Sequence, residues 1–330
     1  MNLSRSALCA AFVSSLVLVR AAPPVVRADA PTLSVLTTTT DLAEIVRTVG
    51  GDRVFVRSLC KGPEDPHFLD ARPSFIRMGG EADLLVVVGM ELEVGYIPLI
   101  LRDGSNPKIK PGSPGYLDAS ARIKKLQVPE GGQVSRAMGD VHPDGNPHYL
   151  LDPANAGVVA EDVAKALSAL APDSAKQFEE RAKGLRGALS DLLLGKPPAD
   201  NPKGRREGGL LDRFKAYKGA SVVSYHDDMI YLARRYGLEV VGTLEPKPGV
   251  PPTADHMAQL ATRAKSANVR AVLYDVFEPA GPVTTFAGEI GATPVLIAHM
   301  PEAVSDATDL LATYRRNAEL LLSALAKGAK

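Results

Sequence analysis

Residues 82–89 read Ala82-Asp83-Leu84-Leu85-Val86-Val87-Val88-Gly89. An unbroken apolar run of this length, bounded by glycine, is typical of a strand covered on both faces, as in a parallel sheet. Working outward, residues 34–40 and 53–59 are two further short β-branched runs, and a helical pattern at 41–49 lies between them. Strands that alternate with helices in this way predict an α/β fold.

A second set of the same kind follows Gly219, with predicted strands at residues 220–225, 239–244, 270–275 and 293–298. Between the two sets, residues 154–170 and 173–194 carry apolar side chains at helical spacing. The second of these helices would be roughly 33 Å long at 1.5 Å per residue, enough to cross from one half to the other. We therefore predict an N-terminal α/β lobe at 31–171, a rigid linking helix at 172–195 and a C-terminal α/β lobe at 196–330.

The N-terminal residues 1–30 have the pattern of a signal peptide. Arg5 precedes an apolar run at 7–19, and Ala28-Asp29-Ala30 fits the small-x-small pattern of a signal-peptidase site. The run falls short of the roughly 20 apolar residues that a membrane span requires. The prediction is export to the periplasm or another extracytoplasmic compartment, with no membrane span after cleavage.

The charge balance excludes a nucleic-acid partner. The chain has 38 basic and 38 acidic residues, of which 35 and 37 lie outside residues 1–30, and no basic stripe stands out. Cys60 alone remains after cleavage, so an internal disulfide is excluded and stability must come from an apolar core.

Four of the six histidines lie just past predicted strand ends or in Pro-rich loops: His67, His148, His226 and His299. Open parallel sheets bind ligands beyond the carboxyl ends of their strands. Neutral imidazole is a donor suited to Zn²⁺, so dispersed loop histidines that a fold gathers together predict a metal site. We expect His142 to lie in a solvent-exposed loop and His256 to lie in the first turn of a helix.

Two of these segments carry motifs that resemble a known family. They are Asp65-Pro66-His67 with Arg72-Pro73-Ser74, and Asn146-Pro147-His148-Tyr149 with Leu151-Asp152-Pro153. Further matches are Tyr225-His226, Tyr231, Arg235-Tyr236-Gly237-Leu238, Glu245-Pro246, Gly291-Ala292 and residues 314–317. Together they resemble the cluster A-I solute-binding proteins, the ZnuA/TroA-like zinc and manganese receptors of bacterial ABC importers.

The resemblance implies two α/β lobes joined by one long helix, with a single metal in the cleft between them. It implies that His67 and His148 are ligands from the N-terminal lobe and that His226 is the first from the C-terminal lobe. His299 takes the fourth position, with Asp275 and Glu278 as carboxylate alternatives. Four nitrogens would favour Zn²⁺, whereas three nitrogens and a carboxylate would better tolerate Mn²⁺.

The function that follows is a monomeric carrier, not an enzyme, that hands Zn²⁺ or Mn²⁺ to the membrane permease of an ABC importer. A zinc hydrolase with Glu278 as its base is one alternative, although no His-Glu-x-x-His motif is present. An adhesin-like interaction protein is another, which would need a sizeable exposed apolar patch. Beside His67, Glu64 and Asp65 either orient the imidazole or belong to a solvated turn.

Overall fold

The computed structural model describes residues 32–129, 142–247 and 249–327, and the predicted signal peptide lies outside them. Residues from Thr32 onward form one compact unit. Its first sheet is parallel, with strand order β2-β1-β3-β4. These strands are β1 (Leu33–Thr37), β2 (Val54–Ser58), β3 (Leu84–Val87) and β4 (Tyr116–Asp118).

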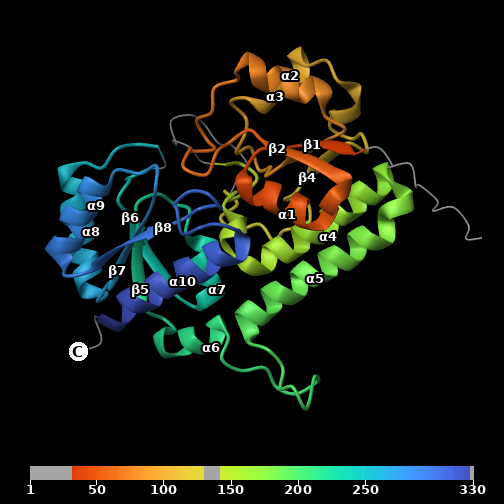
Figure 1. Ribbon diagram of the computed structural model, residues 1–330. Helices are drawn as coiled ribbons and strands as arrows, with labels where there is room; N and C mark the ends of the chain where they lie inside the picture. Colours follow the sequence, from red (N-terminus) through yellow and green to blue (C-terminus); the bar gives the residue numbers. More distant parts are fainter. Residues whose placement is uncertain (1–31, 130–141, 248, 328–330) are drawn as a thin grey trace, which may run out of the picture. The chain divides into compact units, whose positions relative to one another are not determined.

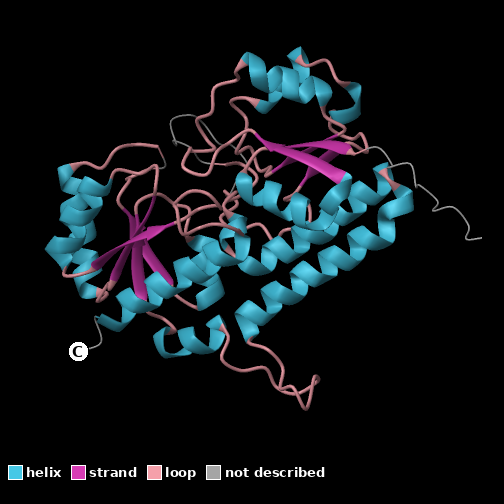
Figure 2. Ribbon diagram, in the orientation of Figure 1, coloured by secondary structure: helices cyan, strands magenta, loops and turns pink. Residues whose placement is uncertain are grey.

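The second sheet repeats this arrangement with strand order β6-β5-β7-β8, again all parallel. Its strands are β5 (Ser221–Ser224), β6 (Glu239–Thr243), β7 (Ala271–Asp275) and β8 (Thr293–Ile297). Figures 1 and 2 show the two sheets as separate groups of strands, each with its own helices. The predicted fold class of two parallel-sheet α/β lobes is confirmed.

Helices cover both faces of the sheets (Figure 2). The burial on both faces predicted for the apolar run is seen in β3, since Leu84 and Val86 pack into one apolar cluster while Leu85 and Val87 pack into another. The helices are α1 (Thr40–Gly50), α2 (Pro73–Glu81), α3 (Ile97–Asp103), α4 (Pro153–Leu170), α5 (Ala175–Leu194), α6 (Leu210–Phe214), α7 (Ile230–Tyr236), α8 (Ala254–Ser266), α9 (Ala280–Ile290) and α10 (Leu310–Lys327).

Helix α5 connects the two cores. Phe178 and Leu189 pack into the apolar cluster under the first sheet, whereas Leu193 packs into the cluster under the second. The helix begins at Ala175, and Pro172–Ser174 form a separate 3₁₀ turn that is preceded by α4. A long helix is thus present where the sequence predicted one, and the lobe boundaries at residues 171 and 195 remain a prediction.

Helix α10 makes a second connection that the sequence did not reveal. Tyr314 near its beginning packs into the first cluster, and Leu321 and Leu325 near its end pack into the second. Helices α5 and α10 therefore each contribute side chains to both apolar cores. Within the described residues, no helix is long and apolar enough to cross a membrane.

Candidate metal centre

The predicted ligands lie where the parallel sheets should place them. His226 is the second residue after the end of β5, and His299 is the second residue after the end of β8. His67 lies in the loop between β2 and α2, and His148 immediately precedes the 3₁₀ turn Tyr149–Leu151. Loops after strands thus deliver all four rings, as the topology of parallel sheets favours.

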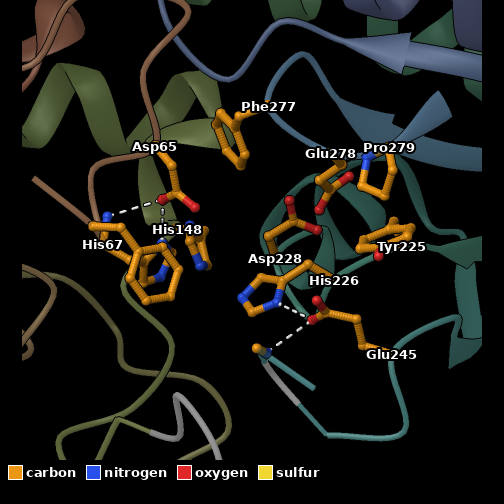
Figure 3. Close-up of a pocket in the computed structure, with 12 residues that line it drawn as sticks. Asp65, His67, His148, Tyr225, His226, Asp228, Glu245, Phe277, Glu278 and Pro279 are labelled. Atoms are coloured by element: carbon orange, nitrogen blue, oxygen red, sulfur yellow. Dashed lines mark hydrogen bonds and ion pairs between the residues drawn. The ribbon is translucent and has the colours of Figure 1, made fainter. Parts of the chain in front are cut away.

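The structure brings three of the four histidines together. One ligand atom each from His67, His148 and His226 lies within 4.8 Å of the others. Their ring centroids are 5.1 Å apart for His67 and His148, 5.5 Å for His67 and His226, and 5.6 Å for His148 and His226. All three line a pocket of about 140 Å³, which Figure 3 shows with His67 and His148 facing His226.

In each of the three rings, Nδ1 contacts a partner. Nδ1 of His67 lies 2.8 Å from Oδ1 of Asp65, and Nδ1 of His226 lies 2.8 Å from Oε2 of Glu245 (Figure 3). Nδ1 of His148 lies 3.2 Å from Nε2 of His299. A metal-binding imidazole normally makes such a contact with its second nitrogen, because the contact fixes the tautomer and the ring orientation.

The opposite nitrogens are left for a metal. Nε2 of His67 and Nε2 of His148 are both buried and have no hydrogen-bond partner. A buried polar atom without a partner costs free energy, which a bound cation would remove. Burial, together with the neighbouring histidines, also lowers the pKa of His148 well below its usual value. The ring is therefore neutral at neutral pH, the form that binds metal.

Asp65 and Glu64, the two acids beside His67, have different partners. Oδ1 of Asp65 accepts from both the backbone N–H and the ring of His67. Glu64 instead accepts from the backbone N–H of Lys61 and pairs with Arg72. Asp65 is therefore the residue that orients His67, whereas Glu64 belongs to the solvated turn.

The structure corrects the position expected for His142. Its ring centroid lies 5.5 Å from that of His67, and its Nε2 is buried without a partner. Burial, with His67 and His226 acting in the same direction, lowers the pKa of His142 to about 4. The expectation of a solvent-exposed ring was wrong because the Gly- and Pro-rich composition around His142 did not show that its ring lies against His67.

The predicted fourth ligand, His299, belongs to a different group. Its Nδ1 lies 3.2 Å from Oδ2 of Asp275, and ligand atoms of His299, Asp275 and Asp228 lie within 4.8 Å of one another. Of the two carboxylate alternatives, Asp275 is thus beside His299, while Glu278 lines the pocket. Asp228 was missed, although its place directly after His226 and Asp227 was a signal in the sequence.

Glu278 is a buried acid whose ionisation opposes folding. Burial, reinforced by the carboxyls of Asp275 and Glu245, raises the pKa of Glu278 from 4.5 to about 9. A carboxylic acid whose pKa is higher in the folded chain than in the unfolded chain destabilises the fold at any pH above the unfolded-chain pKa. This penalty grows with pH until the pH reaches the folded-chain pKa. At pH 8 we therefore expect Glu278→Gln to raise the free energy of unfolding of the metal-free chain by at least about 1 kcal/mol.

Urea unfolding of the metal-free wild type and of Glu278→Gln at pH 5 and pH 8 measures this gain. It should shrink at pH 5, where Glu278 is protonated in the folded chain and only partly ionised in the unfolded one. Glu289→Gln, at an exposed position, is the control and should change little at either pH. An equal gain at both pH values would show that Glu278 ionisation is not the cause.

Comparison with known proteins identifies the family. Residues 35–193 and 209–324 match the family model described as zinc-uptake complex component A, periplasmic (ZnuA). The chain belongs to this family. The match covers both sheets and most of the helices, and it bears out the resemblance read from the histidine motifs.

The names of the curated relatives mention manganese in some cases and zinc in others. The manganese ABC transporter substrate-binding lipoprotein PsaA of Streptococcus pneumoniae is 27% identical over 160 residues, 48% of this chain and 49% of its own length. The high-affinity zinc uptake system protein ZnuA of Brucella abortus is 29% identical over 150 residues, 45% of this chain and 41% of its own length. The matched part spans about half the length of these relatives.

Solved structures share the fold over nearly the whole ZnuA-family chain. A crystal structure of ZnuA superposes with a TM-score of 0.69 at 21% identity, covering 89% of this chain and 99% of that one. The Mn-bound periplasmic metal-binding protein of Candidatus Liberibacter asiaticus gives a TM-score of 0.71 at 19% identity, covering 89% and 100%. At this identity the likeness concerns the fold.

Proposed function

We propose that this ZnuA-family chain captures a divalent transition metal, preferentially Zn²⁺, in the periplasm and delivers it to the permease of an ABC importer. The observation that carries the proposal is the convergence of three imidazoles whose Nδ1 atoms are all engaged. Three nitrogen donors favour Zn²⁺, and Mn²⁺ is the alternative cargo that a carboxylate ligand would favour. The names of the curated relatives support both metals.

In this proposal His67, His148 and His226 bind the metal through Nε2. The contact between His299 and His148 supports a role for His299 that differs from the fourth-ligand position expected from the sequence: it orients His148 as Asp65 orients His67. His148 itself is only 3% exposed, so its ring has little freedom to turn away. We further propose that the carrier is a monomer.

The geometry does not favour the hydrolase alternative. A general base must be ionised near the working pH, and its efficiency is greatest when its pKa lies near that pH. The pKa of Glu278 is raised to about 9, so this carboxyl is protonated and unable to accept a proton at neutral pH. A carrier needs no such base.

The carboxylate of Glu245 is expected to strengthen zinc binding without touching the metal. Its Oε2 accepts from Nδ1 of His226 and from the backbone N–H of Gly249, so it holds the ring in one orientation. We expect Glu245→Gln to lower the Zn²⁺ affinity about 10- to 100-fold, the usual effect of removing such a partner. Competition against a chromogenic chelator measures the change.

Glu239→Gln is the matched control, because Glu239 is an exposed carboxylate at the beginning of the same strand, β6. It should leave the affinity unchanged. If Glu245→Gln binds Zn²⁺ as tightly as this control, then the contact between Glu245 and His226 does not support the metal site.

The carrier function is tested by zinc uptake. Cells that lack this gene but keep the permease should take up radioactive zinc slowly from nanomolar medium. The wild-type gene should restore uptake, and a gene with His67→Ala and His226→Ala together should not. Uptake that is unaffected by the deletion, or restored equally by the double variant, would contradict the proposed function.

A further inference from the structure

Beside the three-histidine group lies a second cluster of potential ligands. Asp228, Asp275 and His299 each offer one ligand atom, and these atoms lie within 4.8 Å of one another. Asp228 is 1% exposed and Asp275 is 0% exposed. The cluster comes from three separate segments, the turn after β5, the end of β7 and the loop after β8.

Each residue of this cluster has one buried atom without a hydrogen-bond partner. Oδ1 of Asp228, Oδ2 of Asp275 and Nδ1 of His299 are all unsatisfied. Oδ2 of Asp275 lies only 3.2 Å from Nδ1 of His299, yet the two atoms are not aligned as a hydrogen bond. Two donors bound to one ion at about 2.1 Å are separated by about 3.0–3.4 Å. The spacing of this one pair, which is also that of an ion pair, is compatible with two ligands of a shared cation.

A third carboxyl group lies beside this cluster. Glu278 adds a third carboxyl, since its Oε2 accepts from the backbone N–H of Asp275 while its Oε1 is buried without a partner. Figure 3 shows the carboxyl groups of Asp228 and Glu278 next to each other on one wall of the pocket. Asp228 is the member of the cluster that lines this pocket, so an ion that enters the pocket meets the cluster at Asp228.

We propose that Asp228, Asp275 and His299 form a second site for a divalent cation, richer in oxygen than the three-histidine group and suited to Mn²⁺. Carboxylate oxygens suit Mn²⁺, whereas an all-imidazole set suits Zn²⁺. One chain would then hold two adjacent sites with different metal preferences. This proposal does not depend on transport, because it concerns only which residues bind which ion.

The contact between His148 and His299 makes the two sites alternatives. A neutral imidazole carries one proton, and Nδ1 of His148 faces Nε2 of His299 at 3.2 Å. When this proton is on His148, its Nε2 can bind metal, and His299 carries its own proton on Nδ1. When the proton is on His299, Nδ1 of His299 can bind the second ion, and His148 is protonated at Nε2. Occupation of one site therefore opposes occupation of the other.

Titrations of the metal-free full chain with Mn²⁺ alone, followed by electron paramagnetic resonance of the free ion, test the second site. Asp228→Asn should lower the Mn²⁺ affinity about tenfold or more, because it removes a charged ligand. His67→Ala should change it less than about threefold. The matched control is Asp227→Asn, because Asp227 bonds the Gln127 side chain instead and should leave Mn²⁺ binding unchanged.

Titrations with Zn²⁺ alone on the same variants complete the test and check that each is folded. For Zn²⁺, we expect His67→Ala to lower the affinity and Asp228→Asn to keep an affinity close to that of the wild type. Equal losses of Mn²⁺ affinity in Asp228→Asn and His67→Ala would mean one shared site and would overturn the proposal. The proposal would also be overturned if Asp228→Asn bound Mn²⁺ as tightly as the wild type, or if this variant lost Zn²⁺ binding. Weak Zn²⁺ binding by the wild type would instead count against the three-histidine site.

Discussion

Replacing His148 by alanine is expected to lower the Zn²⁺ affinity of the chain by about 100- to 1,000-fold. Closed zinc sites bind with roughly 10–16 kcal/mol, so each of three or four ligands accounts for about 3–4 kcal/mol. A loss of that size corresponds to two to three orders of magnitude in the dissociation constant, or roughly 1.4 kcal/mol for each tenfold change. His148 is also the most deeply buried of the three histidines, because His67 and His226 are both partly exposed.

Chelator competition on the purified chain measures this effect. His256→Ala is the control, since His256 contacts the backbone oxygen of Thr243 and lies outside the three-histidine group. It should bind Zn²⁺ like the wild type. If His148→Ala also keeps the wild-type affinity, then His148 is not a ligand and the assignment of the three-histidine site is wrong.

Replacing Arg235 by alanine is expected to destabilise the metal-free chain by about 3 kcal/mol. Nε and a terminal nitrogen of Arg235 contact the two carboxylate oxygens of Asp152 at 2.6 and 2.7 Å. Asp152 is 7% exposed and also accepts from the backbone N–H of Ala154 at the beginning of α4. Breaking a buried pair from one side costs about 3–5 kcal/mol, and the lower end applies because 30% of the Arg235 side chain is exposed.

Urea unfolding of the single and double variants measures this loss. Arg234→Ala, at the exposed neighbouring position on α7, should change the free energy of unfolding by less than about 0.5 kcal/mol. Adding Asp152→Ala to Arg235→Ala should cost less than the sum of the two single changes, because the carboxylate left unpaired is then gone. Strictly additive losses would show that the pair does not act as a unit.

This pair also holds the segment that carries His148. Asp152 lies four residues after His148, in the segment whose Leu150 carbonyl accepts from the hydroxyl of Tyr314 on α10. Elements of the second half of the chain, α7 and α10, thus hold the segment that carries one of the proposed ligands from the first half. Arg235→Ala is therefore expected to weaken Zn²⁺ binding somewhat in addition to lowering stability.

Local sequence patterns were enough to predict the sheets and the three histidines that the structure brings together. The apolar run of β3 indicates burial on both faces, and the histidines after β5 and β8 follow from the rule for parallel strands. The motifs around His67 and His148 supplied the other positions. Each of these signals is contained within a few neighbouring residues, so a single sequence shows it.

The contacts that orient the rings could not be predicted, because they join residues far apart in the chain. Glu245 lies 19 residues from His226, and His299 lies 151 residues from His148. The same holds for α10, whose apolar face gives no sign that its two ends enter different cores. Only tertiary packing shows that the His299 ring lies between His148 and Asp275.

Anomalous X-ray diffraction at the zinc edge, from crystals of the chain loaded with one equivalent of Zn²⁺, tests the central claim most directly. We predict one strong peak about 2.0–2.1 Å from Nε2 of His67, His148 and His226. A peak bound by Asp228, Asp275 and His299 with the three-histidine group empty, or no peak near these histidines at all, would contradict it.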